Sequence, residues 1–169
     1  MNIFATLMCD EGDAVLIPAP YYGGFDLDLS MRAHVKALPI PCAPPTFRLT
    51  VEACEKAYSD AAGKDITVKA IILCNPGNPT GEIIPETLVR EYLEWAKSHE
   101  LQVVMDEIYA FSMLKEETPS ESDVYMGEFD AEEDRQTSPF VSILAMKDIP
   151  DPARTHFVYG FSKDFCLNG

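Results

Sequence analysis

The chain has 169 residues, of which 47% are hydrophobic and 24% charged, and its formal net charge is −15 at pH 7. This length and composition predict one soluble domain with a substantial core, and no apolar run is long enough to suggest a membrane span. The negative charge argues against nucleic acid or anionic membranes as partners, and the acidic, lysine-free start predicts a cytoplasmic protein without a secretory leader.

Short hydrophobic runs and helical patterns alternate in the first third of the chain. Residues 14–18 predict a buried strand and residues 34–39 a second one. Between them, residues 25–31 have an apolar spacing of two that also suits a strand. Their place between two stronger strand candidates favours a crossover helix. Residues 39–45 are rich in proline, which predicts an irregular connection.

The next elements are more sharply defined. A helix is expected over residues 50–62, with Thr50 as its N-cap and Gly63 as its stop. Residues 68–74 form the strongest strand pattern in the chain. Residues 85–98 then have helical spacing, with Leu88, Tyr92 and Trp95 on one face.

Two further strands are expected over residues 101–105 and 155–159. Strand and helix thus alternate repeatedly, which predicts an α/β fold with three α/β/α layers and a mostly parallel sheet. Between these two strands, residues 115–138 are rich in Glu, Asp and Ser and poor in large apolar residues, which predicts an insertion-like, solvated loop. A regulatory or partner-binding arm is the alternative interpretation.

Much of the negative charge lies within that loop. Residues 116–134 contain nine acidic residues and no basic one, and the rest of the chain has 19 acidic residues against 13 basic, a net charge of −6. The remaining body is therefore only mildly acidic. Five cysteines with no CxxC pair predict free thiols, and neither a disulfide framework nor a zinc site is expected.

Three polar strings begin where a predicted strand ends: residues 75–81 (NPGNPTG), 106–109 (DEIY) and 160–163 (GFSK). Because ligands collect at the carboxyl ends of the strands in open α/β sheets, these strings are expected to share one rim. Each has a plain alternative, since the first could be an ordinary turn, Asp106 a helix cap and Lys163 a solvated surface charge.

Taken together, the strings contain the groups that pyridoxal phosphate requires. Lys163 can form an imine with the cofactor aldehyde, and a buried Asp106 can hold a pyridine nitrogen protonated. Asn78 and Tyr109 can reach a phenolic oxygen, and Tyr109 would lie one turn from Asp106 if the segment is helical.

Four strings carry a resemblance to a known family: PAPYYGGFD at residues 18–26, NPGNPTGE at 75–82, DEIY at 106–109 and SKD at 162–164. The sequence resembles the fold-type I, pyridoxal phosphate-dependent aminotransferases of class I/II. Within them it is similar to the 1-aminocyclopropane-1-carboxylate synthase-like branch, to which the first string points. The resemblance implies an amino acid substrate and a homodimer for the intact protein, and it leaves transamination and the synthase reaction both open.

The resemblance also implies a role for each site residue. Tyr22 would stack on the cofactor ring, Asn78 and Tyr109 would hydrogen-bond its phenolic oxygen, and Asp106 would contact the pyridine nitrogen. Lys163 would form the internal aldimine and then carry the proton at the substrate α-carbon.

The sequence departs from the family pattern near its end. Gly160 stands where the family usually has a phosphate-binding serine, and Cys166 stands where a glycine is usual. Residues 1–169 are thus expected to be a central part of the large, cofactor-binding domain, without the small C-terminal domain or the arginines that bind phosphate and substrate carboxylate. A truncated, non-catalytic product that keeps the fold but does not bind the cofactor productively is the alternative.

Overall fold

The computed structural model describes residues 1–112 and 140–167. Within them, one sheet has the strand order β2-β1-β3-β4-β5, and each neighbouring pair is parallel. The strands are β1 (Ala14–Ala19), β2 (Lys36–Pro41), β3 (Val68–Cys74), β4 (Gln102–Asp106) and β5 (Thr155–Val158). The prediction of a mostly parallel sheet is confirmed.

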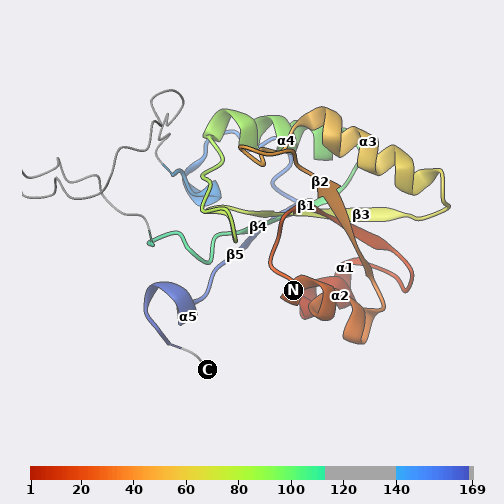
Figure 1. The fold of residues 1–169 in the computed structure, drawn as a ribbon, viewed down its shortest axis with the longest axis horizontal. Helices are drawn as coiled ribbons and strands as arrows, with labels where there is room; N and C mark the ends of the chain where they lie inside the picture. The colour runs from red at the N-terminus through yellow and green to blue at the C-terminus, as the bar shows by residue number, and fades with distance from the viewer. Residues whose placement is uncertain (113–139, 168–169) are drawn as a thin grey trace, which may run out of the picture.

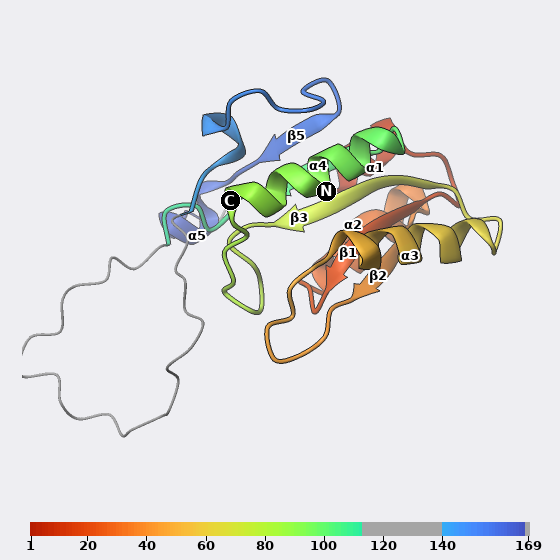
Figure 2. The same cartoon turned by 90° about the horizontal axis from the view of Figure 1, so that it is seen from above.

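Helices cover both faces of this sheet (Figure 1). On one face lie α1 (Asn2–Met8) and α2 (Gly24–Ala33), and on the other lie α3 (Val51–Ala62) and α4 (Glu86–Ser98), which Figure 2 shows in front of the strands. The short helices η1 (Ile143–Ala145) and α5 (Phe161–Asp164) flank β5 in sequence. The predicted α/β/α layering is therefore confirmed. No helix in the described ranges is long and apolar enough to span a bilayer.

The central strands are buried on both faces, which explains their nearly continuous apolar sequences. Residues 14–17 of β1 and 70–73 of β3 are all buried. Their side chains alternate between two cores. One core packs against α3 and α4, the other against α1 and α2. The predicted acidic loop, residues 115–138, lies outside the described residues.

Two elements depart clearly from the sequence expectation. The second strand runs from Lys36 to Pro41 instead of over residues 34–39, because His34 adopts a left-handed conformation that ends α2. The strand also includes two of the prolines that were expected in an irregular connection. An edge strand tolerates them, since only one of its sides is paired.

Helix α1 was not predicted from the sequence. Seven residues are too few for a helix that is stable alone. It forms here because Ala5 is completely buried in the core beside α2 and Phe4 packs against the same core. Tertiary packing, rather than local sequence preference, thus accounts for this element.

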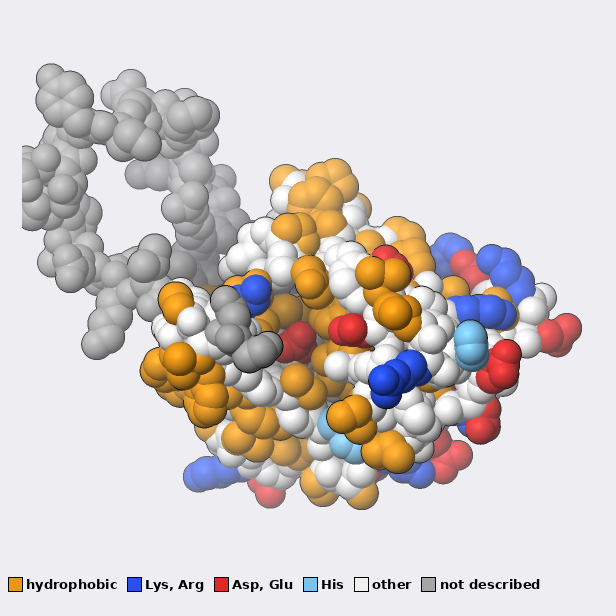
Figure 3. All heavy atoms as spheres, turned by 90° about the horizontal axis from the view of Figure 1, so that it is seen from below, with side chains coloured by type: hydrophobic (Ala, Val, Ile, Leu, Met, Phe, Trp, Pro, Cys, Tyr) orange, Lys and Arg blue, Asp and Glu red, His pale blue; other side chains and the backbone are white. Residues whose placement is uncertain are grey.

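Exposed apolar side chains line the outer surface of the α1 and α2 layer. Ile3 and Leu7 on α1, and Leu27 and Met31 on α2, are each more than half exposed. Figure 3 shows this face of the molecule, on which hydrophobic side chains gather in several groups. Exposed apolar area of this kind is typical of a surface that another segment or chain covers.

One buried hydrogen bond joins α4 to the segment that precedes α3. The hydroxyl of Tyr92 donates to the carbonyl oxygen of Leu49 at 2.6 Å, and Tyr92 is 1% exposed. Thr50, the next residue, caps α3 by accepting the amide of Ala53 at 3.2 Å, as predicted. The bond from Tyr92 therefore fixes the start of α3 against α4.

We expect Tyr92→Phe to destabilise the fold by about 1–3 kcal/mol, because the buried Leu49 carbonyl would lose its hydrogen-bond donor. Urea unfolding followed by circular dichroism measures this loss. Tyr58→Phe on α3 is the control, since that hydroxyl makes no hydrogen bond within the described part of the chain, and it should change stability by less than about 0.5 kcal/mol. Equal stability of the two variants would contradict the expectation.

Candidate functional site

The turn after β3 is built around a buried asparagine. Asn75 is 0% exposed, and its side-chain oxygen accepts the amide of Ile84 at 2.9 Å while its side-chain nitrogen donates to the carbonyl of Ile84 at 3.5 Å. The backbone of Gly77 closes the turn by donating to Glu82 at 2.8 Å. Asn75 thus has a structural task, and Asn78 is left to project from the turn.

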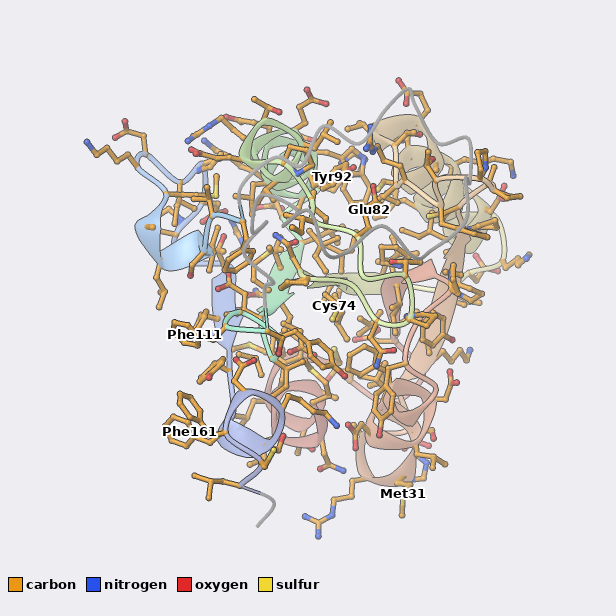
Figure 4. All side chains as sticks on the ribbon, turned by 60° about the vertical axis from the view of Figure 1, so that its left-hand side comes forward. Met31, Cys74, Glu82, Tyr92, Phe111 and Phe161 are labelled. Carbon is orange, nitrogen blue, oxygen red and sulfur yellow. The ribbon has the colours of Figure 1, made fainter. Side chains whose placement is uncertain are left out.

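Two further contacts fix the shape of this turn. A Cβ atom on Gly77 would lie 2.8 Å from the hydroxyl of Thr80, so only glycine fits there without a shift. The guanidinium of Arg48 pairs with the carboxylate of Glu82 at 3.0 Å and joins the turn to the segment before α3. Figure 4 shows Cys74 at the end of β3, with Glu82 and Tyr92 together on the α4 side of the sheet.

The ends of β3 and β4 bring two of the polar strings together. Cys74 pairs with Asp106 in the sheet register, and the amide of Asn75 donates to the carbonyl of Asp106 at 3.0 Å. Beyond the strands, the side-chain nitrogen of Asn78 donates to the hydroxyl oxygen of Tyr109 at 3.4 Å. The structure therefore places Asn78 and Tyr109, which were both expected to face one oxygen atom, in direct contact.

Asp106 is the last residue of β4 and is 8% exposed. Its carboxylate accepts the backbone amide of Ile108 at 3.2 Å. Burial raises the pKa of this carboxyl above its usual value, and the bond from Ile108 opposes that effect. A cationic or N–H donor group beside this carboxylate would stabilise its charged form, so the position suits a protonated ring nitrogen.

Lys163 lies on α5, a helix of one turn, where a polar break between two phenylalanines was expected. Its side chain is exposed. The turn that carries it is close to the turn that carries Tyr109, because the neighbouring Asp164 accepts the amide of Phe111 at 3.1 Å. A Cβ atom on Gly160 would lie 3.2 Å from Ile108, so this glycine allows a close approach of the same two segments.

Tyr22 is not brought into contact with the other candidate residues. Its ring is 55% exposed and packs edge-on against Phe25, with centroids 5.7 Å apart. The ring lies over Gly24, where a Cβ atom would come within 2.2 Å of it. Within the described residues, no hydrogen bond joins Tyr22 or Lys163 to Asn78, Asp106 or Tyr109.

One residue of the site was missed by the sequence reasoning. Glu107 is 0% exposed, and its Oε1 atom accepts the amide of Ile143 at 2.6 Å. Its Oε2 atom is buried without a hydrogen-bond partner in the described structure. Burial raises the pKa of this carboxyl. The available signal was a second acid directly after an apolar strand, which is a costly position unless the acid is paired or protonated.

The cysteines have no role in the site chemistry that the structure supports. All five are free thiols, as predicted. Burial raises the pKa of Cys74, the one nearest Asp106 in the sheet, to about 12, so its reactive thiolate form is rare at neutral pH. Among the residues that the structure describes, no cluster of His, Cys, Asp or Glu side chains could hold a metal ion.

Comparison with known proteins identifies the family. The model of "Aminotransferase class I and II" matches residues 1–169. A mouse protein named "Probable inactive 1-aminocyclopropane-1-carboxylate synthase-like protein 2" is 35% identical over 99% of the chain, and 1-aminocyclopropane-1-carboxylate synthase 6 from rice (Oryza sativa subsp. japonica) is 31% identical over 100%. The chain spans only 27% and 28% of these two relatives, respectively.

Solved structures agree on the fold. The aromatic aminotransferase from Pyrococcus horikoshii OT3 matches 98% of this chain with a TM-score of 0.71 and 24% identity, over 36% of its own length. An aspartate aminotransferase mutant from Thermus thermophilus matches 98% with a TM-score of 0.66. At this identity the likeness supports the architecture alone.

The raised pKa of Glu107 predicts a pH dependence of stability. Because the folded-state pKa lies above the unfolded one, this group contributes stability that is present below pH 4.5, its ordinary pKa, and is lost as pH rises through the folded value. Glu107→Gln keeps an acceptor for Ile143 and removes the titration. We expect the urea midpoint of Glu107→Gln to rise relative to that of the parent as pH increases from 4.5 to 8.

Glu94→Gln, at an exposed position of α4, is the matched control and should follow the parent at each pH. Parallel pH profiles of Glu107→Gln and the parent would show that the buried carboxyl does not hold its proton.

Proposed function

The chain belongs to the aminotransferase class I and II family, and we propose that it forms part of the large domain of a pyridoxal phosphate-dependent enzyme that acts on an amino acid. The observation that carries this proposal is the pairing of Asn78 with Tyr109, 3.4 Å apart, together with the buried carboxylate of Asp106 at the end of the strand that leads to Tyr109. These are the two sets of contacts, to a phenolic oxygen and to a ring nitrogen, that the cofactor needs on one side of its ring.

The residues present fit the ring of the cofactor. Asp106, whose pKa burial has raised, would be stabilised as a carboxylate by an adjacent ring N–H and would keep that nitrogen protonated. Asn78 and Tyr109 would both donate to the phenolic oxygen. When bound, pyridoxal phosphate serves as an electron sink for the substrate's α-carbon.

Lys163 is proposed as the residue that attaches the cofactor covalently and carries the proton at the substrate α-carbon. Its amine is exposed, and its turn is tied through Asp164 to the segment that follows Tyr109. Tyr22 is proposed as the stacking residue. This role requires a rotation of its ring away from Gly24, which the 55% exposure of the side chain allows.

The proposal that the chain is part of a longer protein rests on its relatives. Because the chain spans 27% to 28% of them, we propose that residues 1–169 are a portion of the cofactor-binding domain of a longer, cytoplasmic, homodimeric protein. The exposed apolar side chains on α1 and α2 support packing against further parts of such a protein. Transamination and the synthase reaction share the first proton removal, so the substrate class proposed is an amino acid.

A non-catalytic chain is the second candidate. The name of the mouse relative describes that protein as probably inactive, and Tyr22 here packs on α2 instead of toward Asn78. In that case the fold would be kept while the cofactor would not be held productively.

A titration of the purified chain with pyridoxal phosphate tests the proposal, with the visible absorption of the lysine-bound cofactor as the readout. We expect a band in the parent that Lys163→Ala abolishes, and affinities reduced roughly tenfold in Asn78→Ala and Tyr109→Phe through the loss of one hydrogen bond each. Lys64→Ala is the control lysine, because Lys64 is exposed and lies in the loop before β3, at the other end of that strand from Asn75 and Asn78.

A band that survives in Lys163→Ala would refute the role of that lysine. No band in the parent, with the fold intact by circular dichroism, would favour the non-catalytic candidate.

A further inference from the structure

Asp164 receives hydrogen bonds from three donors in two segments. Its Oδ2 atom accepts the amide of Phe111 at 3.1 Å and the hydroxyl of Tyr159 at 3.0 Å, and its Oδ1 atom accepts the hydroxyl of Ser112. Phe111 and Ser112 directly follow the turn that carries Tyr109, and Tyr159 follows β5. The carboxylate of Asp164 thus joins the segment after β5, which carries Lys163, to the segment after β4, which carries Tyr109.

Other interactions do little to fix α5. It has four residues and contains no buried residue, so neither its length nor core packing stabilises it. Phe161 is 60% exposed and Phe165 54%. Figure 4 shows Phe161 and Phe111 at the same edge of the molecule, with their rings on the outside. The helix that carries Lys163 therefore depends on polar contacts for its position.

The aromatic rings at this edge are arranged around the same carboxylate. The ring centroid of Phe111 lies 5.9 Å from that of Tyr159 and 6.4 Å from that of Phe165. The ring centroids of Tyr159 and Phe161 are 5.8 Å apart. Edge-on contacts between rings are weak when exposed, but they favour one mutual orientation of their segments. Here they hold the donors Phe111 and Tyr159 on the side of α5 from which Asp164 accepts.

The charge state of Asp164 suits this task. Partial burial raises the pKa of the carboxyl, but the bonds from Ser112, Phe111 and Tyr159 together outweigh that effect and lower the pKa below its usual range. The group is therefore ionised at neutral pH. An ionised acceptor makes stronger hydrogen bonds than a neutral one.

We propose that Asp164 is a positioning residue, which fixes the helical turn of Lys163 relative to the turn of Tyr109. The value of this positioning rests on the proposed function, because Lys163 and Tyr109 must face the same cofactor for it to matter. The contacts themselves are independent of any cofactor. Asp164 acts through its neighbours and touches no reacting atom in this proposal.

Amide-resolved hydrogen exchange of the cofactor-free chain is the first test. Asp164→Asn should raise the exchange rates of two amides by roughly three- to tenfold. The amide of Phe111 donates to Asp164, which would lose its charge and one acceptor, and the amide of Phe165 donates to the carbonyl of Phe161 within α5, which would be held less firmly. Ser112→Ala, which removes one donor and leaves Asp164 in place, should have a smaller effect at the same amides. Asp151→Asn is the matched control, since that carboxylate pairs with Arg154 before β5, and it should leave both rates unchanged.

The second test measures where pyridoxal phosphate reacts, after reduction of the adduct with borohydride. In the parent we expect label on Lys163 in excess of exposed Lys64, and in Asp164→Asn this ratio should fall several-fold while the fold is retained. Exchange rates at Phe111 that do not change in Asp164→Asn would overturn the proposal. Faster exchange in Asp164→Asn, together with no preference for Lys163 in the parent, would support the positioning role of Asp164 and reject the proposed function.

Discussion

The parallel pairing of β3 with β4 is the interaction on which the candidate site depends. It aligns Cys74 with Asp106, and one more backbone hydrogen bond, from Asn75 to Asp106, carries the alignment past the ends of the strands. Since parallel strands end at the same edge of the sheet, two polar strings separated by about thirty residues leave the core at one place. The contact between Asn78 and Tyr109 follows from that geometry.

One part of the candidate site is held by the core, and the other part is exposed. Asn75, Asp106 and Glu107 are almost fully buried, so the turn after β3 and the end of β4 are held by the core. Lys163 and Tyr22 instead are exposed residues on the segments that follow β5 and β1. This division suits the proposed function, in which Asn78, Asp106 and Tyr109 would hold one edge of the cofactor ring and Lys163 would need freedom to bind and release the cofactor.

Much of the fold could be predicted because apolar runs such as residues 68–74 are buried on both faces and end in proline, glycine and polar residues. The sequence also marked Asn78, Asp106, Tyr109 and Lys163, since each follows a predicted strand. Helix α1 could not be predicted, because its stability comes from packing that local sequence does not encode. The partner of Glu107, Ile143, likewise lies 36 residues away in the chain, and the packing of Tyr22 on Phe25 is a side-chain orientation that the sequence pattern does not encode.

The two prolines of β2 have a consequence for self-association. Pro39 and Pro41 are two residues apart, so their backbone nitrogens face the same side of the strand, and neither has an N–H to donate. An open sheet edge can recruit a strand from another molecule and so begin an aggregate. With these donors missing, β2 is a poor template for such growth, and the chain gains protection from ordered aggregation at this edge.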